Sequence, residues 1–287
     1  MHNYLIYRAY GRLEYMHECR YSLLKYLSVY NLHPPADTAV VIYTDHPDLF
    51  EAYIPFFPHF QLQELAGSEA FGPKPDFARY LSATYQGNVL YCDTDTYFAL
   101  PPKPVFEKIK TGSFCLHGRT EAAPDLAPYQ HLLAGFVPGH NGANGKKHAS
   151  PAGQPPLYRT HALGFRHTDK SILNNVSTLH EVLKGQVPGE TSEQMAFGFF
   201  LQSHKVHTLQ DAIHSYRDFP EFKKLLHIFF QKNAEESVPN LVKLAHHLDL
   251  QGMKKEKAKF DSLPLLKKWL SRLTGKGWSI RQYQNKI

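Results

Sequence analysis

Short apolar runs alternate with helical patterns over the first 120 residues, and this alternation constrains the fold more than any other feature. The apolar runs cover residues 4–7, 38–45, 60–65 and 89–92. A helical pattern follows the first run and stops at Pro34-Pro35, and another covers residues 76–86 and ends at Gly87. The resulting β-α-β-α-β-α-β order predicts an α/β fold with a mostly parallel central sheet flanked by helices.

The carboxyl ends of parallel strands meet at one edge of a sheet, and ligands bind there in open α/β folds. Residues 7–11, 43–45 and 93–95 would all lie along this edge. Asp45 could also cap a helix that begins near Pro47. We therefore expect the ligand site at this edge.

The pattern changes after a further strand-like run at residues 113–117. Residues 118–159 are rich in Gly, Pro, His and Ala, which predicts a flexible loop of the length used for lids. Six histidines in and beside this region are expected to be solvated: His117, His131, His140, His148, His161 and His167.

Regular structure is expected again from residue 160. Helices are predicted over residues 168–184 and from Thr191 onward, and residues 205–210 form a last strand. We assign residues 1–225 to one catalytic domain and residues 226–287 to a helical, basic C-terminal extension.

The formal charge of +6 is concentrated at the C-terminal end. Residues 251–287 contain ten Lys or Arg against Glu256 and Asp261, a local charge of +8. Apolar residues there share one helical face, flanked by Lys267, Lys268 and Arg272: Leu265, Leu266, Trp269, Leu270 and Leu273. This pattern suits an interfacial helix on an anionic membrane surface, or an ordinary docked terminal helix with a solvated basic side. No nucleic acid partner is expected, because the basic residues are confined to one segment without a nucleic-acid module.

Cys19, Cys92 and Cys115 are odd in number and lie in apolar sequence, as reduced core thiols do. No signal peptide and no apolar stretch of membrane-spanning length is present in the sequence. We expect a cytoplasmic protein, with a peripheral position at the inner face of the membrane if the basic segment binds lipid.

The stretch NVLYCDTDTYF, residues 88–98, places two aspartates directly after an apolar strand. Asp93 and Asp95 would point to the same side of an extended chain, and Thr94 away from them. Two carboxylates at this edge suit manganese or magnesium and, through the metal, a substrate phosphate. The competing interpretation is a polar turn at a strand end.

The stretch resembles the apolar strand and D-x-D motif of glycosyltransferases with the Rossmann-like GT-A fold. It is most similar to the nucleotide-diphospho-sugar transferases related to glycogenin and to the bacterial lipopolysaccharide glucosyl- and galactosyltransferases. The resemblance covers about residues 1–225 and implies a hexosyltransferase-type enzyme with a UDP-sugar donor and manganese or magnesium. The acceptor, whether glycan, lipid or protein, stays open.

The resemblance also implies site residues. Asp95 would bind the metal, Asp93 the metal and the donor ribose, and His214 would complete the metal shell. Glu193 and Gln194 would lie beside the donor sugar. The residues implied for binding the rest of the donor are Tyr7, Ala9, Tyr10, Thr44, Asp45, Arg79, Thr94 and Lys223, with Lys224 as an alternative to Lys223.

Two departures from the family pattern affect the acceptor and sugar assignments. The segment THALGF, residues 160–165, stands where an Asn-Ala-Gly type segment is expected, and Ser215 separates His214 from Tyr216. The family leans towards retention of the anomeric configuration, but no residue here requires it.

Several residues have purely structural interpretations. Thr191 and Gln194 match a helix capping box. Tyr7, Tyr10 and Tyr43 could be packing residues, and Arg79 a surface helix residue.

Two other functions compete with a transferase. A phosphatase of the haloacid dehalogenase type also places an Asp-x-Asp after an apolar strand and uses the first aspartate as nucleophile. A non-catalytic protein that binds a sugar nucleotide or a membrane surface is the third possibility.

Overall fold

The computed structural model describes residues 2–64, 72–120, 129–133, 136, 155–274 and 277–284. The residues predicted as a flexible loop lie largely outside these ranges. The described part of that loop includes the end of strand β6 (Phe114–Arg119) and the one-turn helix α4 (Gln130–Leu133).

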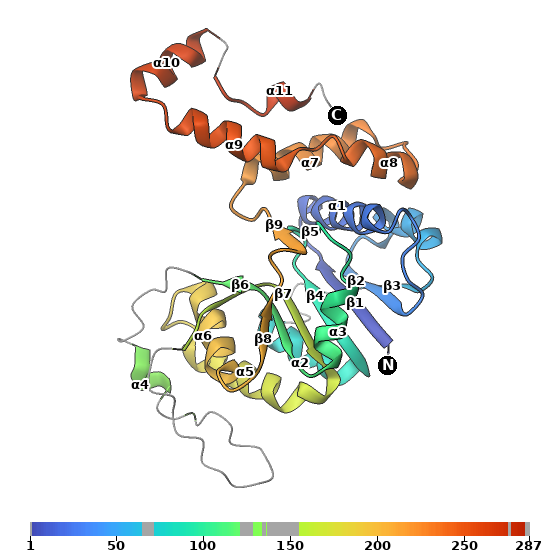
Figure 1. Cartoon of the computed structure of the whole chain (residues 1–287), viewed down its shortest axis with the longest axis vertical. Helices are drawn as coiled ribbons and strands as arrows, with labels where there is room; N and C mark the ends of the chain where they lie inside the picture. Colours follow the sequence, from blue (N-terminus) through green and yellow to red (C-terminus); the bar gives the residue numbers. More distant parts are fainter. Residues whose placement is uncertain are drawn as a thin grey trace.

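A seven-stranded sheet forms the centre of the molecule, in the order β3-β2-β1-β4-β7-β6-β8 (Figure 1). Its strands are β1 (His2–Ala9), β2 (Thr38–Thr44), β3 (Phe60–Glu64), β4 (Gly87–Cys92), β6 (Phe114–Arg119), β7 (Tyr158–Arg166) and β8 (Val206–Thr208). Neighbouring strands are parallel except where β7 lies antiparallel to β4 and β6. The expected α/β fold with a mostly parallel sheet is confirmed.

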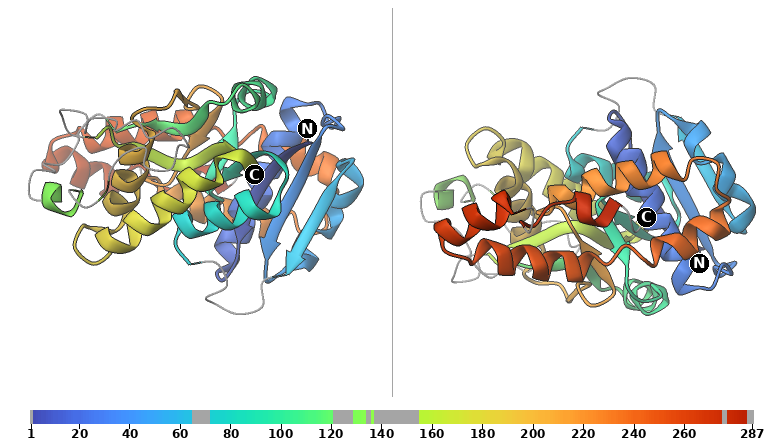
Figure 2. Two further views of the ribbon diagram at one scale, coloured as in Figure 1. Left: turned by 90° about the horizontal axis from the view of Figure 1, so that it is seen from below. Right: turned by 90° about the horizontal axis from the view of Figure 1, so that it is seen from above.

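Helices cover both faces of this sheet because successive strand residues point to opposite faces. Ile6, Val41 and Val89 face one cluster of buried side chains, which includes helices α2 (Lys74–Thr84), α5 (Lys170–Leu183) and α6 (Gly189–Leu201). Leu5 and Val40 face the other, with α1 (Leu13–Val29) and α3 (Lys103–Lys110). Figure 2 shows these layers from both ends.

The C-terminal helices form a further layer outside α1 (Figure 1). They are α7 (Pro220–Lys232), α8 (Val238–Ala245), α9 (Leu250–Asp261), α10 (Leu265–Leu273) and α11 (Arg281–Gln284). Buried residues of α7, α8 and α9 join the same core as α1 and β1. The boundary expected at residue 225 therefore falls inside α7, and the division into two domains stays a prediction.

A small second sheet pairs β5 (Thr96–Phe98) with β9 (Ile213–Ser215) in antiparallel fashion. The strand expected over residues 205–210 is β8, but β9 was not anticipated. Its three residues are too few to show a period-2 pattern, and its pairing with β5 is a long-range contact. The pairing places residues 213–215 beside β5, the strand that follows Asp93 and Asp95 in the sequence.

Two expected helix caps are wrong. The chain after β2 forms two 3-10 helices, η1 (Pro47–Leu49) and η2 (Glu51–Phe56), and Asp45 does not cap them. Helix α6 begins at Gly189 rather than Thr191, with Pro188 at its N-cap and no side-chain cap hydrogen bond. The capping-box explanation for Gln194 is therefore removed.

Candidate active site

The carboxyl ends of β1, β2 and β4 form the expected edge. Strand pairing aligns Ala9 with Thr44, and Tyr7 with Cys92, so the segments that follow these strands are neighbours. Asp45 ties two of them together, because its carboxylate accepts a hydrogen bond from the Gly11 backbone N–H at 3.0 Å. Gly11 has φ +92°, a conformation that favours glycine.

The chain turns at the aspartate pair instead of staying extended. The Asp93 carbonyl accepts hydrogen bonds from the backbone N–H and the hydroxyl of Thr96, at 3.2 and 2.7 Å. The Asp93 N–H is fixed by the carbonyl of His161 on β7, at 2.8 Å. Asp93 and Asp95 still share one pocket of about 210 Å³, lined also by Arg8, Tyr10, Tyr15, Glu18, Tyr91 and Thr94. We name it the aspartate pocket.

Asp93 is paired with a buried lysine. Lys74 Nζ lies 2.8 Å from Asp93 Oδ2 and 3.5 Å from Glu193 Oε1. It also donates a hydrogen bond to the Thr160 carbonyl at 3.0 Å. Burial alone would lower the pKa of Lys74, but Asp93 and then Glu193 raise it above the ordinary value. The ammonium is therefore a fixed positive charge between two carboxylates.

Asp95 is paired with a second lysine, on α7. Lys223 Nζ lies 3.0 Å from Asp95 Oδ2 and 3.1 Å from Glu18 Oε1. The Thr94 hydroxyl donates to Glu18 Oε2 at 3.0 Å. Burial raises the pKa of Glu18 to about 7; Asp95 also raises it and Lys223 opposes the shift. Each aspartate of the pair thus has its own lysine: Lys74, which is buried, for Asp93, and Lys223, which is partly exposed, for Asp95.

Lys74 also lines a second, larger pocket of about 690 Å³. Its polar lining combines positive and negative groups: Lys74, His180, Lys184, Glu190, Ser192, Glu193 and Arg217. Tyr129 adds an aromatic side chain, and residues 185–189 form part of the rim. We name it the α6 pocket. Lys74 belongs to its lining and touches Asp93 in the aspartate pocket, so one side chain connects the two.

Two histidines expected to be solvated are buried. His117 on β6 and His161 on β7 are 7% and 5% exposed, and their rings lie 5.1 Å apart between centroids. His161 Nε2 contacts Glu190 Oε1 at 3.3 Å, and this contact is the main cause that lowers the pKa of Glu190 to about 2. Burial lowers the pKa of His117 to about 4, with a further contribution from His161. Neither ring nitrogen of His117 has a hydrogen-bond partner among the described residues.

Gln194 and Glu193 lie beside this group on α6. Gln194 donates to Glu190 Oε1 at 3.3 Å and accepts a hydrogen bond from the Thr120 hydroxyl at 3.2 Å. The Thr160 hydroxyl donates to Glu193 Oε1. The Glu-Gln pair is therefore held by Thr120, the residue that follows β6, and by Thr160 on β7, rather than by a capping box.

Among the described residues, neither the Arg79 nor the His214 side chain makes a hydrogen bond or an ion pair with Asp93 or Asp95. The Arg79 side chain is 51% exposed and lies 3.6 Å from Asp76 on its own helix. His214 Nδ1 shares a hydrogen bond with the Tyr97 hydroxyl at 3.1 Å. Burial lowers the pKa of His214, and Lys254 lowers it further.

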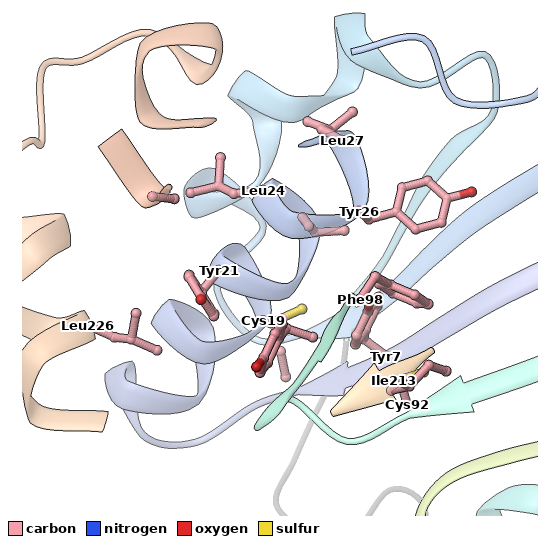
Figure 3. Close-up of a cluster of buried hydrophobic side chains, with 14 of the residues drawn as sticks. Tyr7, Cys19, Tyr21, Leu24, Tyr26, Leu27, Cys92, Phe98, Ile213 and Leu226 are labelled. Atoms are coloured by element: carbon pink, nitrogen blue, oxygen red, sulfur yellow. The ribbon is translucent and has the colours of Figure 1, made fainter. Parts of the chain in front are cut away.

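Several residues implied for donor binding are core residues. Tyr7, Ala9 and Thr44 are fully buried, and Tyr7 belongs to the cluster under α1 drawn in Figure 3. The Tyr7 and Ser22 hydroxyls are 2.8 Å apart, and the Thr44 hydroxyl accepts the His46 N–H at 3.0 Å. Of the aromatic residues named for this role, Tyr10 is the one that lines the aspartate pocket.

The carboxylates fit a divalent cation that is completed by a substrate. Magnesium is usually held by one or two protein carboxylates together with substrate phosphates and water. Asp95 Oδ1 is buried and has no hydrogen-bond partner among the described residues. No three His, Cys, Asp or Glu side chains in the described part of the chain are grouped closely enough to hold a metal by themselves.

The sequence did not reveal Lys74, Glu18, Glu190 or the histidine pair. Lys74 lies two residues before the predicted helix and is brought to Asp93 by the actual helix start. Glu18 had one signal, because an acidic residue beside Cys19 on the apolar face of α1 needs a buried cation. The histidines are brought together by the antiparallel pairing of β6 and β7, which local sequence does not show.

No protein-family model and no curated protein sequence matches the chain. Among solved structures, it is similar to the glycosyltransferase GlyE of Streptococcus pneumoniae TIGR4, with 12% identity and a TM-score of 0.43 over 82% of this chain. The match spans about half of that protein, 49% of its chain. Mouse xyloside xylosyltransferase 1, in its apo form, is similar with 11% identity and a TM-score of 0.44, over 72% of this chain and 85% of its own.

Proposed function

We propose that the chain is a glycosyltransferase that moves a sugar from a nucleotide-diphospho-sugar, a UDP-sugar, to an acceptor. The observation that carries the proposal is the Lys74–Asp93 ion pair, which links two pockets, because Lys74 lines one of them and Asp93 the other. Asp93 and Asp95 line the aspartate pocket at the carboxyl edge of the sheet, and Glu193 lines the α6 pocket beyond. Two substrates could meet at this junction, as a transfer reaction requires.

The donor diphosphate is assigned to the aspartate pocket. Tyr10 and Tyr15 offer aromatic faces for a base, and Arg8, Lys74 and Lys223 supply positive charge near the phosphates. Departure of a nucleoside diphosphate builds up negative charge, which fixed cations in a site of low dielectric stabilise. Lys74 and Lys223 are therefore assigned to neutralising this charge.

Asp93 and Asp95 would hold manganese or magnesium, with the donor phosphates completing the shell. A bound divalent cation would act as a Lewis acid on the phosphate oxygens. Asp95 Oδ1, a buried acceptor without a partner among the described residues, supports this assignment. The Tyr97 hydroxyl occupies His214 Nδ1, so His214 would join this shell through Nε2.

The acceptor is assigned to the α6 pocket. Carboxylates at Glu190 and Glu193 can accept hydrogen bonds from sugar hydroxyls, and Tyr129 can pack against a sugar ring. Gln194 is placed to fix the orientation of Glu190. The chemistry of the acceptor and the anomeric outcome stay open.

A cytoplasmic location belongs to the same proposal. All three cysteines are free and buried, as is usual for proteins in a reducing compartment. Within the described residues, none of the helices has the length and apolar character needed to cross a lipid bilayer.

A screen of nucleotides and nucleotide sugars by thermal unfolding, each with and without manganese, tests the donor assignment. A ligand that binds only the folded state raises the melting temperature, and the increase grows with the logarithm of ligand concentration over Kd. We expect UDP and a UDP-sugar to raise it, with a larger increase when manganese is present. Stabilisation by GDP or by adenine nucleotides alone would refute the UDP assignment. The phosphatase alternative would be favoured instead if the unmodified chain hydrolysed an aryl phosphate and the Asp93→Asn variant did not.

A further inference from the structure

The strongest exposed apolar feature in the described part of the chain is one face of α10. Eleven large hydrophobic side chains are exposed among all the described residues, and five of them belong to this nine-residue helix. Their exposed fractions are 84% for Leu265, 70% for Leu266, 58% for Trp269, 47% for Leu270 and 65% for Leu273. The other six are scattered over the rest of the molecule, so the face on α10 is a concentrated patch.

The five side chains point in one direction. At 100° per residue, positions 265, 266, 269, 270 and 273 fall within one stripe of the helix. Lys267 and Lys268 lie on its two sides. A helix with a continuous apolar stripe and lysines at its borders has the shape of an interfacial helix that lies in the plane of a bilayer.

Helix α9, which precedes α10, carries further exposed lysines. Lys255 and Lys259 are exposed and form no ion pair with any described residue. Lys257, in contrast, is neutralised by Glu221 at 3.1 Å and Asp261 at 3.8 Å. Lys255 and Lys259 thus add unpaired positive charge on the helix that precedes the apolar stripe.

The rest of the molecule holds α9 in place. Leu250 and Met253 of α9 are buried in the core shared with α1. Helix α10 follows after Pro264 and lies at the outer end of the C-terminal layer, away from the sheet (Figure 1). The apolar stripe is therefore presented outward from an anchored support.

We propose that α10 and the exposed lysines of α9 bind the surface of a lipid bilayer that contains anionic lipids. The apolar stripe inserts at the level between headgroups and acyl chains, and the lysines contact lipid phosphates. Charge complementarity selects this partner, because residues 251–287 have a net charge of +8 and a surface of anionic lipid is extended and negative. This surface is separate from both pockets, so binding does not depend on the proposed sugar transfer.

Co-sedimentation of the full chain with vesicles tests the proposal. Vesicles of three parts phosphatidylcholine to one part phosphatidylglycerol should bind the chain, and pure phosphatidylcholine vesicles should bind it much less. Lys267→Glu combined with Lys255→Glu should weaken binding by about fivefold or more for each lysine. Leu266→Gln combined with Leu270→Gln should abolish it.

Matched controls are available elsewhere on the chain. The double variant Lys103→Glu and Lys110→Glu on α3 reverses two lysine charges at another place on the surface. The double variant Ile54→Gln and Leu100→Gln replaces two apolar side chains outside α10 that are 45% and 54% exposed. Both control variants should bind vesicles as the unmodified chain does.

The two tryptophans give a second measurement. Trp269 lies in the stripe, whereas Trp278 is half-buried against Phe219 and donates a hydrogen bond to Tyr283. Anionic vesicles should shift tryptophan fluorescence to the blue in the Trp278→Phe variant and not in Trp269→Phe. Equal binding by the stripe variants and the controls would overturn the proposal. The unmodified chain could instead form a dimer that binds no vesicles. If Leu266→Gln combined with Leu270→Gln dissociated that dimer, the partner that covers the stripe would be a second copy of the chain.

Discussion

Lys74 Nζ lies 2.8 Å from Asp93 Oδ2, and both side chains are largely buried, 10% and 17% exposed. The ion pair joins the start of α2 to the end of β4. Lys74 also approaches Glu193 at 3.5 Å, so one ammonium balances two carboxylates from separate elements. Lys74 lines the α6 pocket, and its partner Asp93 lines the aspartate pocket.

Substitution Lys74→Met should weaken both stability and donor binding. It leaves Asp93 and Glu193 without their cation, and breaking a buried pair costs about 3 kcal/mol in the free energy of unfolding. Urea unfolding measures the first effect, and calorimetric titration with UDP measures the second.

Arg79→Ala is the control, because Arg79 is half exposed and its ion pair with Asp76 is worth less than about 1 kcal/mol. We expect its UDP affinity to stay close to that of the unmodified chain. If Arg79→Ala reduced UDP affinity as much as Lys74→Met, the phosphate contact would belong to Arg79, as the family resemblance implies.

Tyr7→Phe should separate packing from donor binding. The substitution removes a buried hydrogen bond to Ser22, which costs about 1 kcal/mol of stability, and should leave UDP affinity unchanged. Tyr10→Ala removes an aromatic face from the aspartate pocket and should weaken UDP binding by about tenfold. A loss of UDP affinity in Tyr7→Phe would contradict the placement of Tyr7 in the core.

Stability should fall as the pH is lowered from about 6.5 to about 4, in part through His117. Burial lowers the pKa of His117 to about 4 in the folded chain, so the unfolded chain binds the proton first. The neutral ring contributes its full stability above pH 6.5 and loses it as the pH falls, up to about 3 kcal/mol.

The contribution of His117 is the difference between the unmodified chain and His117→Gln, compared by urea unfolding at several pH values. The variant should lose stability less steeply with falling pH. His131→Gln on α4, an exposed histidine, should not change the slope. Equal slopes in the His117→Gln variant and the unmodified chain would mean that His117 does not titrate as a buried group.

The sequence predicted the sheet and its functional edge because those depend on local patterns. Apolar runs of four to eight residues identified β1, β2 and β4, and the parallel order placed Asp45 and Asp93 at one edge. The two helix caps failed because long-range contacts, Asp45 to Gly11 and Gln194 to Thr120, take the side chains that local rules assign to capping.

The partners of the aspartates could not be predicted in the same way. Lys74 reaches Asp93 across 19 positions, and Lys223 reaches Asp95 across 128. His117 and His161 looked solvated because they stand next to a region rich in Gly and Pro, yet β6 and β7 bury them. Such contacts follow from the tertiary fold rather than from spacing along the chain.

Calorimetric titration of UDP into the unmodified chain and into Asp95→Asn, with and without manganese, tests the central claim most directly. The Asn side chain keeps the shape of Asp95 but removes the charge that would hold the cation. We predict manganese-dependent UDP binding by the unmodified chain and by Asp48→Asn, an exposed control on η1, and none by Asp95→Asn. Manganese-dependent UDP binding of equal strength in Asp95→Asn would contradict the account.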